Sequence, residues 1–125
     1  MLHTVNFIQL FIKQKKAIWI VTGTKWNAHT GPLFIEIRLF TVFNINRLQT
    51  CCFMYKISRV ALPLYFLNLF VLNNQVHFHN TRQAEKFHVI SHKTNVRAFS
   101  IQVFGFKLWN DFNLNLTNCQ TLAIL

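Results

Sequence analysis

Alternation of apolar and polar residues marks several predicted elements as strands. After the Gly31-Pro32 pair, residues 35–39 alternate between Ile or Leu and a charged side chain, the pattern of a half-buried strand. Residues 17–21 also fit a strand better than a helix, because bulky and β-branched side chains dominate them. These segments predict a fold in which strands prevail.

The longest alternating region predicts a β-hairpin over residues 97–117. Apolar residues occupy every second position from 99 to 103, and the phase then slips at Gly105, as a β-bulge would cause. Asn110 and Asp111 are suitable for a two-residue turn into a further alternating run.

One helix is predicted within this strand-rich pattern. It covers residues 81–92, with Asn80 as the N-cap residue and Gln83 three positions later. Repeats and Gly, Pro or Ser-rich boundaries are missing from the sequence, which predicts a single unit over residues 1–125. The predicted class is therefore α+β and strand-leaning, with a chain lacking a unique fold as the alternative.

The most hydrophobic stretch runs from Val60 to Leu72. It is 13 residues long, whereas a helix that spans a bilayer needs about 20, and it contains Pro63 and Asn68. We interpret it as a buried helix or strand. The alternative is a segment inserted into a membrane or lying at its surface.

The N-terminal segment does not resemble a secretory signal. Its apolar residues, 5–12, precede its basic cluster, 13–16, and a signal peptide has the opposite order. Read as a helix, the segment places four polar side chains on one stripe: Asn6, Gln9, Lys13 and Lys16. Such a helix could lie among lipid headgroups, so localisation stays open between membrane association and other sites.

The charge is strongly positive. There are 13 Lys and Arg residues against 3 Asp and Glu, which gives a net charge of +10. Such a field favours an anionic membrane surface or nucleic acid as partner. Most aromatic residues lie inside apolar runs, which is typical of a core rather than of a base-stacking surface.

Catalytic patterns are lacking. The carboxylates Glu36, Glu85 and Asp111 are scattered, and neither a GxSxG sequence nor a phosphate-binding glycine loop occurs. We therefore expect no enzyme activity, and we assign no catalytic or cofactor-binding residues.

The thiols and imidazoles give no zinc signature. Cys51, Cys52 and Cys119 are expected to be free thiols, because adjacent cysteines rarely pair and a third is left over. His88 and His92 have the i, i+4 spacing of helical zinc ligands, but Val89 stands where the HExxH motif has Glu. His77 and His79 would share one face of a strand. We expect no metal site.

The composition suggests an origin instead of an activity. Val, Ala, Asp, Glu and Gly, whose codons begin with G, supply only 21 of the 125 residues. Residues encoded by A and T-rich codons dominate. The first hypothesis is therefore a short open reading frame in AT-rich DNA, translated without selection for a protein function. The alternatives are a small basic membrane-associated protein and, after it, a basic nucleic-acid-binding protein.

Overall fold

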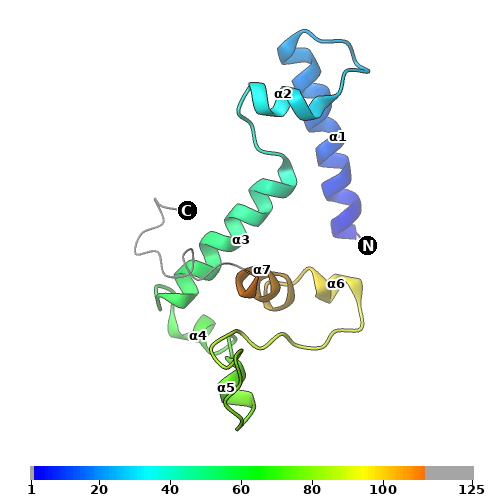
Figure 1. Ribbon diagram of the computed structural model, residues 1–125. Helices are drawn as coiled ribbons and strands as arrows, with labels where there is room; N and C mark the ends of the chain where they lie inside the picture. Colours follow the sequence, from blue (N-terminus) through cyan, green and yellow to red (C-terminus); the bar gives the residue numbers. More distant parts are fainter. Residues whose placement is uncertain (1, 112–125) are drawn as a thin grey trace. The chain divides into compact units, whose positions relative to one another are not determined.

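The structure, a computed structural model, describes residues 2–111, and this part of the chain is mostly helical (Figure 1). One short segment, η1, is a π-helix. The elements in chain order are α1 (Leu2–Thr22), α2 (Thr30–Glu36), α3 (Val42–Ser58), α4 (Leu64–Leu67), α5 (Asn73–Val76), α6 (Asn95–Ala98), η1 (Ile101–Gly105) and α7 (Phe106–Asn110).

The predicted strand-leaning α+β class is wrong. Between residues 2 and 111 the only β pairing is an isolated antiparallel bridge between Leu72 and Phe87, and no sheet forms. A short alternating segment forms a strand only if a second strand pairs with it. Here helical hydrogen bonds satisfy the backbone N–H and carbonyl groups of these segments instead.

Residues 35–39, predicted as a strand, lie in and after α2. Pro32 stands in the first turn of this helix, where a missing N–H costs nothing. Phe34 is buried and Ile37, three residues later, is half-buried, whereas Ile35 is 80% exposed, so the inward face follows a helical period. Residues 17–21 are likewise helical, because α1 continues to Thr22.

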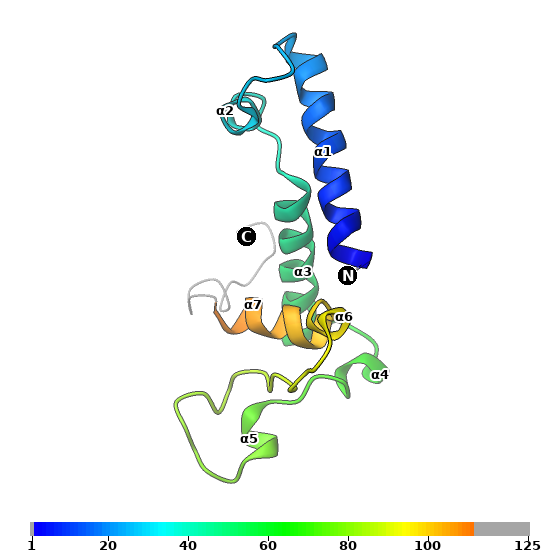
Figure 2. The same cartoon turned by 90° about the vertical axis from the view of Figure 1, so that its right-hand side faces the viewer.

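The hairpin predicted over residues 97–117 is wrong for its first arm. This region forms the end of α6, then η1 and α7, which Figure 2 shows beside the C-terminal half of α3. Val103 and Phe106 are both 1% exposed, a spacing of three that brings them to one helical face. Residues 112–117 lie outside the described part. The helix predicted over residues 81–92 is also wrong, since these residues form turns and the bridge at Phe87.

By their internal contacts, the residues group into two compact units, Met1–Leu48 and Gln49–Leu125. The grouping by contacts does not show whether each unit folds independently. The single unit predicted over residues 1–125 therefore stays a prediction. In the first unit, Phe11 of α1 stacks on Phe34 of α2 with ring centroids 6.1 Å apart. Gln14 adds two hydrogen bonds, donating to the Phe40 carbonyl and accepting from the Val42 N–H.

The second unit has an aromatic core. Phe106 packs against Phe70 and Phe87, with ring centroids 5.3 and 5.1 Å away. Met54 of α3, which is 0% exposed, belongs to the same cluster. Gly105 allows this approach, because a Cβ there would lie 3.0 Å from the Met54 sulfur. The core is therefore built where η1 and α7 meet α3.

Helix α3 ends in a Schellman motif. The N–H of Val60 donates to the Ile57 carbonyl at 3.0 Å, and the N–H of Ala61 donates to the Lys56 carbonyl at 2.9 Å. Val60 has φ +55°, in the left-handed region that glycine tolerates best and a β-branched residue least. This helix end is therefore strained.

The same motif follows α1 and α2. Gly23, with φ +65°, occupies the left-handed position after α1, whereas Arg38, with φ +53°, occupies it after α2. A non-glycine residue in this conformation costs about 1–2 kcal/mol. Of these three helix ends, only that of α1 thus has a glycine at the position whose geometry favours it.

Candidate functional site

Large apolar side chains are exposed around the C-terminal end of α1. Ile20, Val21 and Trp26 are 80%, 77% and 78% exposed. Ile20 and Trp26 line a shallow groove together with Trp19, whose indole N–H donates to the Ala28 carbonyl at 3.0 Å. We call Trp19, Ile20, Val21 and Trp26 the α1-end patch.

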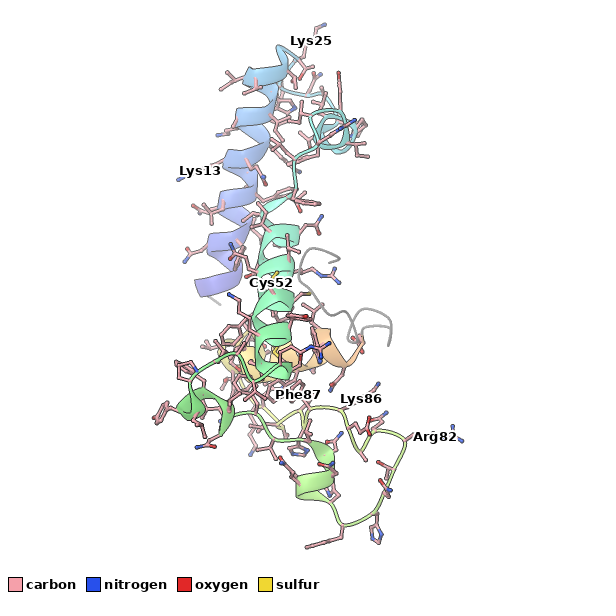
Figure 3. The ribbon with its side chains drawn as sticks, turned by 90° about the vertical axis from the view of Figure 1, so that its left-hand side faces the viewer. Lys13, Lys25, Cys52, Arg82, Lys86 and Phe87 are labelled. Carbon is pink, nitrogen blue, oxygen red and sulfur yellow. The ribbon has the colours of Figure 1, made fainter. Side chains whose placement is uncertain are left out.

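Cations lie beside the α1-end patch. Lys16 lines the same groove, and Lys25 directly precedes Trp26. Figure 3 shows Lys25 in the loop after α1 and Lys13 pointing away from α2. Apolar side chains next to ammonium groups are the combination with which peripheral proteins contact anionic lipid headgroups.

The stretch from Val60 to Leu72 contains both buried and exposed apolar side chains. Phe70 is buried in the core of the second unit, whereas Val60, Leu64 and Tyr65 are 70–79% exposed. Among the described residues, no helix is long and apolar enough to cross a bilayer. This stretch therefore both anchors the core and presents apolar side chains to solvent.

The thiols lie on α3 and differ in access. Cys51 is buried and Cys52, labelled in Figure 3, is half-buried, and among the described residues neither cysteine forms a disulfide. Cys119 lies outside the described residues. A half-buried thiol is open to alkylating reagents, whereas a buried one behaves as a small apolar side chain.

The three carboxylates are exposed. Glu36 ends α2 in the first unit, Glu85 lies in the turn before Phe87, and Asp111 follows α7. Glu85 lines a cavity together with apolar side chains such as Phe70 and Trp109, but an exposed carboxylate lacks the fixed geometry that general acid or base catalysis needs. The absence of enzyme activity stays a prediction.

The histidines do not lie next to the partners that their spacing in the sequence predicts. His88 and His92 do not share a helix, since residues 88–92 have no regular secondary structure, and His88 instead contacts His77, with ring centroids 5.8 Å apart. The bridge at Phe87 folds these segments together, a long-range pairing that spacing along the chain does not reveal. Within residues 2–111, no three His, Cys, Asp or Glu side chains gather as a set of metal ligands.

Comparison with protein-family models, with curated proteins and with solved structures gives no match to this chain.

Proposed function

We propose that this chain is the product of a short open reading frame in AT-rich DNA, without a function for which its sequence was selected. The composition motivates the proposal, and the strained helix ends are the structural observation that supports it. In selected proteins the local choice of residue agrees with the global fold. Here Arg38 and Val60 stand where a glycine fits, so local preference and fold disagree.

The starts of the short helices support the same proposal. The N-cap positions of α2 and α4 hold His29 and Pro63, and neither residue makes a side-chain capping hydrogen bond. Ser, Thr, Asp or Asn at an N-cap contributes about 1 kcal/mol. Thr94 before α6 shows the favourable case, since its hydroxyl accepts from the Arg97 N–H.

A thermal melt of the purified chain followed by circular dichroism tests this proposal. We expect a broad transition of low cooperativity, because strained and uncapped helix ends weaken the preference of the chain for one structure. A sharp two-state transition contradicts the proposal. So does a purine-leading three-base periodicity in the coding DNA, since that periodicity reflects selection on the encoded protein.

The second candidate function is binding to anionic membrane surfaces, which the α1-end patch favours. Soluble monomers rarely expose large contiguous apolar patches, and such patches mark sites that contact lipid or protein. Lipid is the better fit here, because Lys16 lines the same groove and Lys25 directly precedes Trp26 in a chain of net charge +10. The basic nucleic-acid-binding protein remains the third hypothesis.

Co-sedimentation with vesicles tests the second candidate. The full chain is mixed with phosphatidylcholine vesicles that contain phosphatidylserine, and with neutral phosphatidylcholine vesicles. We expect sedimentation with the anionic vesicles that weakens as salt is raised, because salt screens the headgroup attraction. A chain that stays in the supernatant with both kinds of vesicle contradicts membrane binding.

A further inference from the structure

A groove of the first unit lies beside α2. Its lining comes from α1, from α2 and from the residues that lead into α3, and its volume is about 440 Å³. Ligand pockets in proteins usually have volumes of about 300–1,000 Å³. Figure 2 shows α2 beside the C-terminal half of α1. We call this the α2 groove, and its lining includes Phe11, Lys15, Phe34, Arg38 and Phe40.

The apolar part of the α2 groove is built on aromatic rings. Phe34 is buried, and the half-buried Phe11 stacks on it with ring centroids 6.1 Å apart. Ile35 and Phe40, which also line the groove, are 80% and 61% exposed. The groove therefore offers apolar surface to water, and a bound hydrocarbon group would cover that surface favourably.

Two cationic side chains line the same groove. The ammonium group of the half-buried Lys15 lies over the Phe11 ring, 4.5 Å from its centroid, and this contact holds the charge beside the apolar surface. Arg38 follows α2, and its planar guanidinium carries a fork of donors that matches a carboxylate. Among the described residues that line the groove, none is Asp or Glu, although Glu36 lies two positions before Arg38.

We propose that the α2 groove binds a hydrophobic monocarboxylate of the fatty-acid class. Lys15 and Arg38 bind the carboxylate, and the hydrocarbon chain lies against the phenylalanine rings. Thr41 adds a donor, because its hydroxyl accepts from the Asn44 N–H at 3.3 Å and keeps its own hydrogen to donate. The inference goes beyond both candidate functions and holds whether or not the sequence was selected, since it rests only on charge and apolar surface in one groove.

Isothermal titration calorimetry of the full chain tests the proposal with three probes. Decanoate, kept below its micelle-forming concentration, has both the anionic head and the chain. Decyltrimethylammonium has the same chain with a cationic head, and acetate has the head without the chain. We expect decanoate to bind, and the other two to bind roughly tenfold more weakly or not at all. Comparable affinity for decyltrimethylammonium overturns the proposal.

Arg38→Gly separates a loss of binding from a loss of structure. Glycine relieves the strain of φ +53°, so this variant should be at least as stable as the unaltered chain. Loss of the guanidinium should nevertheless weaken decanoate binding roughly tenfold or more. A variant that keeps the decanoate affinity of the unaltered chain contradicts the proposed role of Arg38.

Lys15→Gln should weaken decanoate binding by a similar factor, and Lys13→Gln is its matched control. Lys13 is an exposed residue of the same helix, and its side chain points away from α2 (Figure 3). The control removes the same charge from the chain and should leave the affinity for decanoate unchanged. Equal affinity in the two variants overturns the proposal, because it shows that only the overall charge attracts the anion.

The α1-end patch is another apolar surface of the first unit, and Trp26→Ala tests whether decanoate binds there instead. Trp26 does not line the α2 groove, so this variant should keep the affinity of the unaltered chain. Binding that is lost in Trp26→Ala and kept in Arg38→Gly overturns the proposal. Circular dichroism should show the same helix content in these variants.

Discussion

The side chain of Asn110 pairs with the backbone of Phe87 as a neighbouring strand would. Its amide oxygen accepts from the Phe87 N–H at 3.1 Å, and its amide nitrogen donates to the Phe87 carbonyl at 2.9 Å. In the bridge between Leu72 and Phe87, the hydrogen bonds are made by the residues on either side of this pair. The N–H and the carbonyl of Phe87 itself therefore point away from Leu72. A residue from α7 therefore satisfies both groups beside the aromatic core.

Replacement of Asn110 tests this pairing. Asn110→Leu leaves the N–H and carbonyl of Phe87 without these partners, and we expect a loss of about 1–3 kcal/mol. Amide hydrogen exchange measured by NMR should show faster exchange at Phe87. Asn95→Leu, at an exposed position on α6, is the control and should leave that rate unchanged. Equal exchange in the two variants contradicts the pairing.

Asn110 also shows how the sequence prediction failed. The sequence indicates a turn residue at Asn110, and a hairpin follows if residues 99–103 are a strand. Instead the helical face of Val103 and Phe106 is buried against α3, and this burial outweighs local alternation. The apolar content that predicts a core is visible in the sequence, whereas the period that orients it depends on partners distant along the chain.

The strained end of α3 should be relieved by glycine. Val60→Gly keeps the two hydrogen bonds of the Schellman motif and removes the steric cost of φ +55°. We expect a gain of about 1 kcal/mol, less the entropy that glycine adds to the unfolded chain. Arg38→Gly should act in the same direction after α2. Helix content by circular dichroism and the urea midpoint report both changes.

Two other glycine positions serve as controls for that prediction. Gly23→Val places a β-branched residue at φ +65° and should destabilise the chain. Gly31→Ala lies within α2 with open space around it, and should stabilise the chain by roughly 0.5–1 kcal/mol. A lower midpoint for Val60→Gly than for the unaltered chain contradicts the assigned strain.

Phe106 should be the most sensitive position of the second unit. Phe106→Ala removes a ring that is 1% exposed and contacts Phe70 and Phe87, and such truncations cost about 3–5 kcal/mol. Near-ultraviolet circular dichroism and urea unfolding should show the loss. Phe78→Ala, whose ring is fully exposed, should unfold as the unaltered chain does. Similar unfolding of both variants is the result expected of a chain without a unique core.

The contact between His77 and His88 was harder to derive from the sequence than the core. Histidine spacing pointed to His88 and His92, yet the contact formed is with His77, because the bridge at Phe87 reverses the chain between them. The one signal in the sequence is the pair Asn73 and Asn74, a residue type that favours turns. Such turns leave no fixed period, so spacing alone does not identify them.

Membrane binding through the α1-end patch makes the most specific prediction about surface residues. Ile20→Ser with Trp26→Ala removes two exposed apolar side chains, each contributing up to about 1.5–3 kcal/mol when fully buried. We expect at least a tenfold weaker partition into anionic vesicles. Lys16→Glu with Lys25→Glu should weaken binding to anionic vesicles only, because each Lys near such a surface contributes about 1 kcal/mol.

The matched control for the patch is Phe78→Ser, which removes an exposed apolar ring from the second unit. If the α1-end patch is the contact, this change alters partition less than twofold. Equal losses from Phe78→Ser and from the patch variant indicate adhesion by any apolar side chain, which contradicts a defined membrane-binding surface. Because all these positions are exposed, the variants should keep the helix content of the unaltered chain, and circular dichroism checks that the comparison concerns binding alone.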